Sequence, residues 1–284
     1  MIYTLKNNEI TVAISSVAAE IVSVLKDGKE RVWQNETGEW SGHGPVLFPV
    51  CGHFGLTVDG KAYPIGAHGF AKKSDFALLD KTENSATRGL RSDENTKKVY
   101  PFDFLFTVTY RLVGSVVEIA YKVQNLAKTP LYFACGGHES FAIDTDRVDE
   151  YQIVFDNEED IVHQAHDDDG YLTGETQDFG RAKAFTLPYD FFQEGRTLIL
   201  KNLRSRKASL CKKGGEKVVE ITFDGFDNLL LWRGGNAKYI CIEPWTNLPD
   251  LANTPDIEFS QKAGVIKVDG EKEITLVRTV KYGD

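Results

Sequence analysis

The chain has 284 residues, close to the size of roughly 250–300 residues up to which one hydrophobic core still serves. A composition of 42% hydrophobic and 26% charged residues argues against an intrinsically disordered chain. The net charge is −9 and the lysines are scattered among acidic residues, so no basic surface is expected for a nucleic acid backbone, and nucleic acid is not an expected partner.

The N-terminal segment and the cysteines indicate the compartment. Met1–Lys6 lacks the basic start and the apolar run of a signal peptide, and no stretch approaches the roughly 20 apolar residues that span a bilayer. The four cysteines are far apart and form no C-x-x-C pair, which predicts buried thiols rather than disulfides or a zinc site. We therefore expect a cytoplasmic protein with no membrane partner.

Alternation of apolar and polar residues with a period of two dominates the chain and predicts β-strands. The clearest case is the pair of runs Phe104–Leu112 and Val116–Val123, which Gly114-Ser115 is predicted to join as a hairpin turn. In chain order, the predicted strands are Glu9–Ile14, Glu20–Leu25, Phe104–Leu112, Val116–Val123, Leu131–Cys135, Tyr151–Phe155, Val218–Phe223, Leu229–Trp232, Tyr239–Ile242 and Glu273–Val280.

The spacing of these runs predicts the fold class. Almost no segment shows a sustained apolar period of 3.6 residues, so helices are expected to be few and short. Many short strands separated by turn signals such as Asp27-Gly28 predict an all-β fold, with large antiparallel sheets packed face to face as a β-sandwich. No Pro/Gly/Ser-rich linker divides the chain, so residues 1–284 are expected to form one domain. The acidic clusters Glu158–Asp160 and Asp167–Asp169 are interpreted as solvated loops.

Three segments gather ionisable side chains beside glycine, proline or aromatic residues: Ala67–Lys72, Gly136–Phe141 and Cys241–Trp245. His138 follows two glycines after an apolar run, which predicts a position at a strand end. Glu243 ends another apolar run, and the proline after it is expected to stop that strand from pairing further. Taken singly, each is also compatible with a structural role, as a hydrogen-bonded histidine or a loop carboxylate.

His163 and His166 precede three aspartates, a pattern that is compatible with metal binding. A specific site needs a third and a fourth ligand in a closed shell, and nothing in this acidic stretch defines them. We therefore expect no metal there.

The three segments and an early Gly-Pro segment occur in one order along nearly the whole chain, and this combination resembles the aldose 1-epimerase (galactose mutarotase) superfamily, in particular its LacX-like branch. The matching motifs are Gly44–Pro49, His68–Ala71, Gly137-His138 with Phe141, and Glu243–Trp245 followed by Asp250. The resemblance implies the large antiparallel β-sandwich called a supersandwich, a sugar as substrate, and a monomer or homodimer. It implies no cofactor, because the reaction has no redox step.

By motif match, the resemblance implies that His138 is the general acid and Glu243 the general base. Opening a cyclic hemiacetal removes the anomeric hydroxyl proton and protonates the ring oxygen, after which the C1–C2 bond rotates and the ring closes on the other face. Reference pKa values of about 4.3 for Glu and about 6.5 for His suit an ionised Glu243 and a protonated His138. A glycosidase would use two carboxylates instead.

Further positions are implied to contact the substrate. The resemblance assigns His68 to sugar oxygens, and Asp190 resembles a position that touches sugar hydroxyls. Lys72 stands where many relatives have Arg, and His53 stands where some do, so both are candidates for polar contacts. Trp245, next to the general base, offers an apolar surface to sugar C–H groups.

Two alternatives remain open. A hexose-6-phosphate 1-epimerase would keep His138 and Glu243 and add cationic groups for the phosphate, for which Lys72, Lys73 and His53 are candidates. A noncatalytic carbohydrate-binding or regulatory protein would use the same fold, since a fold does not determine a function.

Overall fold

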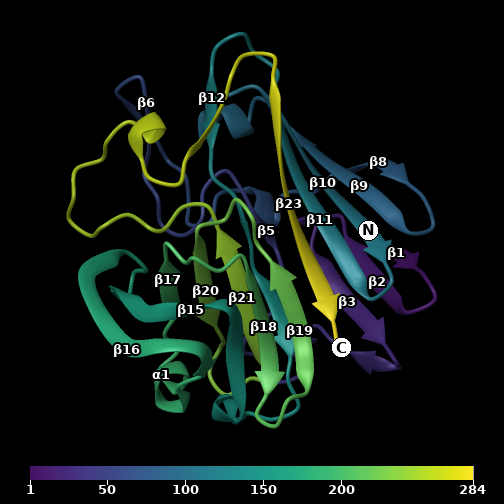
Figure 1. Ribbon diagram of the computed structural model, residues 1–284. Coiled ribbons are helices and arrows are strands. Elements are labelled where there is room, and N and C mark those ends of the chain that lie inside the picture. Colours follow the sequence, from purple (N-terminus) through teal and green to yellow (C-terminus); the bar gives the residue numbers. More distant parts are fainter. Residues whose placement is uncertain (284) are drawn as a thin grey trace.

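The structure is a computed structural model that describes residues 1–283, and it is built almost entirely of β-strands (Figure 1). The strands are β1 (Ile2–Lys6), β2 (Ile10–Ser15), β3 (Ile21–Lys26), β4 (Lys29–Glu30), β5 (Val46–Leu47), β6 (Leu56–Val58), β7 (Lys61–Tyr63), β8 (Ala77–Lys81), β9 (Ser85–Arg91), β10 (Phe104–Val113), β11 (Val116–Asn125), β12 (Leu131–Phe133), β13 (Gly136–Gly137), β14 (Glu139–Ala142), β15 (Tyr151–His166), β16 (Leu172–Thr186), β17 (Leu198–Lys201), β18 (Lys207–Lys212), β19 (Lys217–Thr222), β20 (Asn228–Trp232), β21 (Tyr239–Trp245), β22 (Ile266–Val268) and β23 (Glu273–Tyr282). Besides them stand the short α-helix α1 (Tyr189–Gln193) and the 3-10 turns Ala71–Lys73, Thr96–Lys98, Val148–Glu150 and Phe259–Gln261. Within residues 1–283, no helix is long and apolar enough to cross a membrane.

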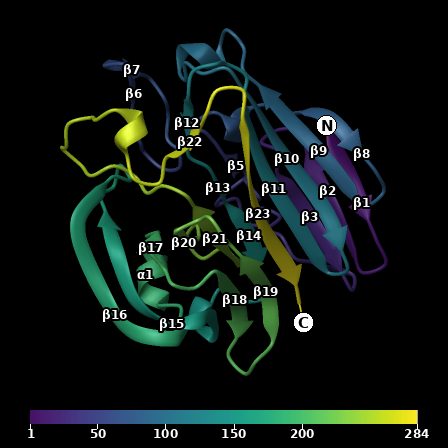
Figure 2. The same cartoon turned by 45° about the horizontal axis from the view of Figure 1, so that its top comes forward.

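One long antiparallel sheet carries most of the strands, in the order β5-β13-β21-β20-β17-β15-β18-β19-β23-β11-β10-β9-β8. Strand β14 also pairs with β21, and β16 pairs with β15. A second sheet, β1 to β4, lies beside the β8–β11 part of the long sheet in both ribbon views (Figures 1 and 2). The Tyr110 hydroxyl of β10 donates a 2.5 Å hydrogen bond to the carbonyl of Ala19, between β2 and β3. The predicted all-β sandwich is confirmed.

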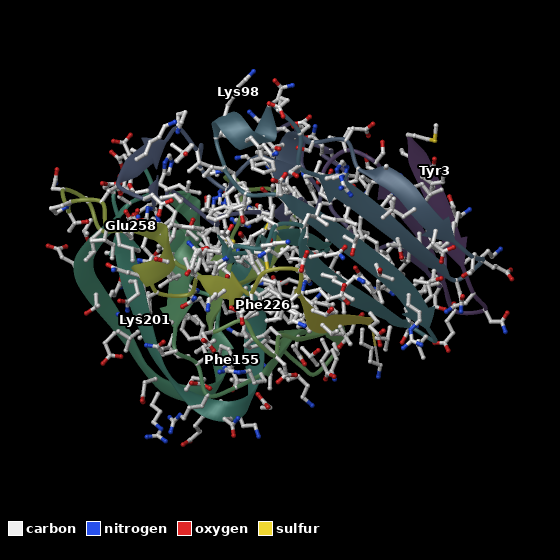
Figure 3. The ribbon with its side chains drawn as sticks, turned by 90° about the horizontal axis from the view of Figure 1, so that it is seen from above. Tyr3, Lys98, Phe155, Lys201, Phe226 and Glu258 are labelled. Carbon is white, nitrogen blue, oxygen red and sulfur yellow. The ribbon has the colours of Figure 1, made fainter. Side chains whose placement is uncertain are left out.

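Alternating apolar side chains of the predicted strands fill the main core. On β10 and β11, Phe106 pairs with Val123 and Val108 with Tyr121, and all four are buried. Figure 3 shows the densely packed interior, with the buried Phe226 near its centre and Lys98 pointing outward. The predicted hairpin is confirmed, since Val113 and Val116 pair around a turn in which Gly114 has φ +58°. The predicted burial of the four cysteines is also confirmed.

The predicted strand Tyr151–Phe155 is only the beginning of β15, which forms a long hairpin with β16. The cluster Glu158–Asp160 therefore lies in a strand, and its interpretation as a solvated loop was wrong. Glu159 is buried and accepts hydrogen bonds from the backbone N–H groups of Ser205 (2.6 Å) and Arg204 (3.2 Å). Register shifts on both sides of Glu159 break the period-two pattern that would have marked the strand. The cluster Asp167–Asp169 does lie in the turn between β15 and β16.

A buried ion pair joins β14 to β23 within the core. The guanidinium group of Arg278, which is 1% exposed, donates to the Glu139 carboxylate and to the hydroxyl of Tyr121 (2.7 Å). The pair also explains why position 137 is a glycine. A Cβ atom there would lie 2.3 Å from an Arg278 nitrogen and 2.6 Å from a Glu139 oxygen. Both charges are desolvated, so each depends on the other.

Glu139→Gln is expected to lower the free energy of unfolding by about 3–5 kcal/mol, because the buried Arg278 charge loses its counterion. Urea unfolding followed by tryptophan fluorescence measures this change. The matched control is Glu118→Gln, which removes a partner of the exposed Arg111 and is expected to cost at most about 1 kcal/mol. Equal losses in the two variants would contradict the proposed stabilising role of the buried pair.

Candidate active site

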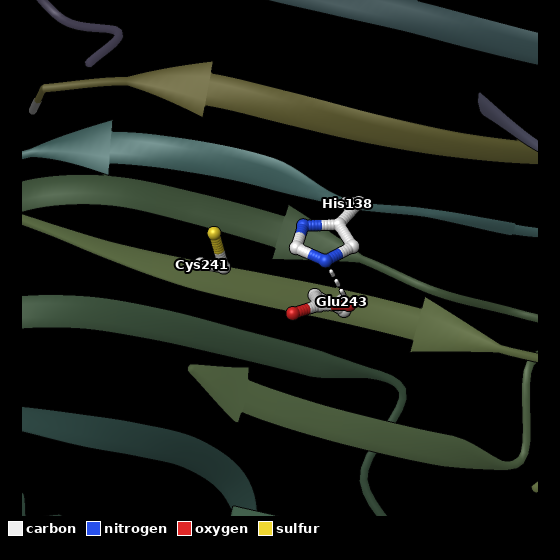
Figure 4. Close-up of side chains that lie close together, drawn as sticks. All are labelled: His138, Cys241 and Glu243. Atoms are coloured by element: carbon white, nitrogen blue, oxygen red, sulfur yellow. Dashed lines mark ion pairs between the residues drawn. The ribbon is translucent and has the colours of Figure 1, made fainter. Parts of the chain in front are cut away.

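His138 and Glu243 face each other across adjacent antiparallel strands. Glu139 of β14 pairs with Ile242 of β21, and the same register one residue further sets His138 opposite Glu243. Directly opposed residues have Cβ atoms about 4.5–5.5 Å apart, so their side chains can meet. The Nε2 atom of His138 lies 3.3 Å from Oε2 of Glu243, the contact drawn in Figure 4.

Strand β21 continues through Pro244, so the expectation that this proline ends the strand was wrong. Pro244 pairs with Leu229 of β20, and Trp245 pairs with Gly136 of β13. The proline stands opposite the break between β13 and β14, where the ladder is already interrupted. Glu243 is therefore held within a paired strand rather than at a strand end, which fixes its side chain more firmly.

Alternation along β21 sends Glu243 to the face of the sheet that lies away from the main core. Ile240 and Ile242 belong to the main core, whereas Cys241 and Trp245 belong to two smaller clusters on the opposite face. Glu243 shares the face of Cys241 and Trp245, and it is only 1% exposed. A cleft of about 940 Å³ lies over this face, and both His138 and Glu243 line it.

The cleft has an apolar floor and aromatic walls beside the acid–base pair. Leu230 and Ile199, from the neighbouring strands β20 and β17, line it together with Glu243. The ring of Trp40 lies 5.0 Å from that of His138, and the ring of Trp232 lies 5.8 Å from it. Such surfaces suit the C–H faces of a sugar. Trp232 was not predicted as a site residue, although it ends a predicted strand.

Four of the predicted substrate-contacting residues, His68, Lys72, His53 and Trp245, line this cleft. The backbone N–H of Gly52 donates a 3.0 Å hydrogen bond to Nδ1 of His68, which leaves Nε2 to carry the proton of the neutral ring. Burial lowers the pKa of His68 well below its usual value, and His138 adds to this effect. His68 is thus built as a neutral hydrogen-bond donor.

His53 and Asp190 occupy different surroundings. The His53 ring lies 4.9 Å from that of Tyr171, so this residue connects the cleft to the β15–β16 hairpin. Asp190 lies exposed on α1, outside the residues that line the cleft. Its neighbours Phe191 and Phe192 are buried and anchor the helix, which turns Asp190 outward.

Burial shifts the pKa values of both His138 and Glu243. Burial lowers the pKa of His138 to about 4, and the positive charge of Lys72 contributes. Burial raises the pKa of Glu243 well above its usual value, with a further contribution from Glu139 that the Trp245 indole partly opposes. Both shifts disfavour the charged forms of the two side chains. The expected ionised Glu243 and protonated His138 were based on the pKa values of solvated side chains, and burial moves both pKa values away from these references.

The chemistry of the neighbouring groups favours proton transfer over metal ligation. Potential ligand atoms of His138, Cys241 and Glu243 all lie within 4.8 Å of one another (Figure 4). Burial raises the pKa of the Cys241 thiol well above its usual value. A metal ion would require both this thiol and the Glu243 carboxyl group to lose their protons in a buried site, so the cluster fits a metal poorly.

His163 and His166 lie on β15 rather than on a loop, and both line the cleft. Nδ1 of His163 accepts a hydrogen bond from the N–H of Ile199 (3.1 Å). In His166, Nε2 accepts from the N–H of Thr197 (3.2 Å), and Nδ1 lies 2.9 Å from the carbonyl of Asp167. With both ring nitrogens engaged, His166 is positioned as a structural residue. His163 keeps one nitrogen for a ligand.

Comparison with known proteins agrees with this architecture. Residues 1–263 match the family described as aldose 1-epimerase. The chain is 30% identical over 268 residues to the chromosomal protein LacX of Lactococcus lactis subsp. lactis, a match that covers 87% of this chain and 88% of that protein. A solved galactose mutarotase related enzyme from Lactobacillus acidophilus is 30% identical with a TM-score of 0.90, over 99% of this chain and 97% of that one.

A galactose mutarotase-like protein from Lactobacillus casei is 25% identical with a TM-score of 0.91, over 99% of both chains. The resemblance seen in the ordered motifs thus extends over nearly the full length in both sequence and fold. The chain belongs to the aldose 1-epimerase family.

Proposed function

We propose that the protein is an aldose 1-epimerase that interconverts the α and β anomers of a hexose without a cofactor. The observation that carries this proposal is the 3.3 Å approach of His138 Nε2 to Glu243 Oε2 on the wall of a cleft of about 940 Å³. Membership of the aldose 1-epimerase family supports it. The aromatic walls and the neutral donor His68 supply the contacts that a polyhydroxylated ring needs.

The reaction requires one acid and one base, and a pair that holds a single proton provides both. The general base Glu243 takes the proton of the anomeric hydroxyl while the general acid His138 protonates the ring oxygen. Sugar hydroxyls that donate to the carboxylate stabilise its charged form, and the proton then moves from Glu243 to the imidazole of His138, whose Nε2 lies 3.3 Å from Glu243 Oε2. After rotation about C1–C2, ring closure reverses both transfers. The pair ends each cycle with the proton count with which it began.

Glu243→Gln and His138→Asn are each expected to reduce the acceleration of mutarotation by about 10²–10⁴-fold, since each removes one proton-transfer group. Polarimetry of freshly dissolved α-D-glucose and α-D-galactose measures the rate. Asp190→Asn is the control, because Asp190 is exposed outside the cleft and its loss is expected to leave the rate unchanged. A parental rate in either cleft variant would refute its assigned role. Sugar binding by the parent protein without acceleration would indicate a noncatalytic binding protein.

The pH dependence of kcat/KM is expected to be bell-shaped. Below about pH 4, His138 also binds a proton and the pair has no base, so activity falls. Above the raised pKa of Glu243, both groups are deprotonated and no acid remains, so activity falls again. Between these limits, activity is expected to persist above the usual histidine pKa of about 6.5. An alkaline limb at that usual histidine pKa would contradict the effect assigned to burial.

A hexose phosphate is the second candidate substrate, because Lys72 lines the cleft as a cation whose charge is not paired by any residue from 1 to 283. Among the described residues, no carboxylate lies within ion-pair distance of the Lys72 ammonium group. Such a group attracts a phosphate as a point charge. The same assay with glucose 6-phosphate, compared between the parent protein and Lys72→Met, tests this candidate. Faster mutarotation of glucose 6-phosphate than of glucose would favour the hexose phosphate, provided that Lys72→Met loses this difference.

A further inference from the structure

The cleft extends along its floor well beyond the acid–base pair. Glu243 on β21 pairs with Leu230 on β20, and Leu230 pairs with Ile199 on β17. The N–H of Ile199 then donates to His163 on the next strand, β15. Adjacent strands lie about 4.8 Å apart, so these three steps place His163 roughly 14 Å from Glu243. All four residues line the same cleft.

One sugar ring fills only part of this space. The volume of about 940 Å³ is near the upper end of the roughly 300–1,000 Å³ that is typical of sites for drug-sized ligands. A hexose is much smaller than such a ligand. With its anomeric carbon between His138 and Glu243, a hexose leaves the β15 end of the cleft open. The apolar floor of Leu230 and Ile199 continues under this unfilled part.

The β15 end of the cleft carries a buried hydrogen-bond donor that the proposed reaction does not use. His163 is 4% exposed, and its Nδ1 accepts from the backbone of β17, so the proton of the neutral ring stands on Nε2. Burial lowers the pKa of His163 to about 4, which keeps this ring neutral near pH 7. Thr173 on β16 and Arg196 line the same end and add polar groups. These groups can bind hydroxyls.

The charge of this end disfavours an anionic ligand. Asp167–Asp169 and Glu175 line it, and none of these four carboxylates has an ion-pair partner in residues 1–283. The guanidinium group there, that of Arg196, already pairs with Glu194 at 2.5 Å. A phosphate or carboxylate entering this end would meet uncompensated negative charge, whereas neutral hydroxyls would find acceptors.

We propose that the β15 end of the cleft, around His163, Thr173 and Arg196, is a second subsite that binds a neutral sugar unit linked to the reducing-end sugar. The preferred substrate is then a neutral reducing disaccharide. Its reducing unit keeps a free anomeric hydroxyl between His138 and Glu243, so the ring-opening chemistry is unchanged. A unit attached at the opposite side of that ring extends over the apolar floor. This inference rests on the proposed function and specifies its substrate class.

Polarimetry of freshly dissolved lactose and maltose beside α-D-glucose tests the subsite, because glucose is the reducing unit of both disaccharides. The parent protein is expected to show a kcat/KM at least about ten-fold higher for the disaccharides, the effect of two or three net hydrogen bonds. Thr173→Tyr adds a ring at the far end and is expected to abolish this preference while the glucose rate is kept. Thr176→Tyr is the matched control, since Thr176 is exposed on the same strand outside the cleft lining.

The outcomes separate the two proposals. Acceleration of glucose with no preference for the disaccharides, or a preference that Thr173→Tyr leaves intact, would overturn the second subsite and leave the epimerase proposal standing. No acceleration of any neutral sugar would overturn the proposed function and with it the subsite. The disaccharide-to-glucose ratio of the parent protein provides the test without any variant, and the glucose rate of Thr173→Tyr reports whether that variant is folded.

Discussion

The register between β13–β14 and β21 is the constraint on which the site depends. Side chains alternate between the two faces of a sheet, so a slip of one residue would turn His138 into the core and Glu139 into the cleft. The ion pair of Glu139 with Arg278, on the core face, opposes such a slip because the pair would be broken. Adjacent residues of one short segment thus place the Glu139 carboxylate on the core face and the His138 imidazole in the cleft.

The same burial that holds the pair also sets its chemistry. Removing His138 and Glu243 from water disfavours the charged forms of both side chains. The proposed reaction removes one proton from the anomeric hydroxyl and delivers one proton to the ring oxygen. It suits such a pair, because neither transfer leaves two like charges in the cleft. The rings of Trp40 and Trp232 lie 5.0 Å and 5.8 Å from that of His138 and contribute to its burial.

The long β15–β16 hairpin determines how far the cleft extends. It contributes His163, Thr173 and the acidic turn, none of which belongs to the motifs around the acid–base pair. Two contacts connect the end of this hairpin to the rest of the cleft. The backbone N–H of Leu172 donates to the carbonyl of Asp250, and the ring of Tyr171 lies beside that of His53. The proposed reaction and the proposed choice of substrate therefore involve different parts of one sheet.

Local patterns in the sequence were enough to predict the all-β fold class and the candidate side chains of the site. The period-two runs that became β10 and β11 are local patterns, and His138 and Glu243 stand in short motifs that can be read without a partner. Only the folded chain shows that these two residues are cross-strand neighbours, that burial raises the pKa of Glu243, and that Asp190 lies outside the residues that line the cleft. Strand pairing, burial and pKa values depend on residues that are distant in the chain. In β15, the bulges also interrupt the period-two alternation that would have marked the strand in the sequence.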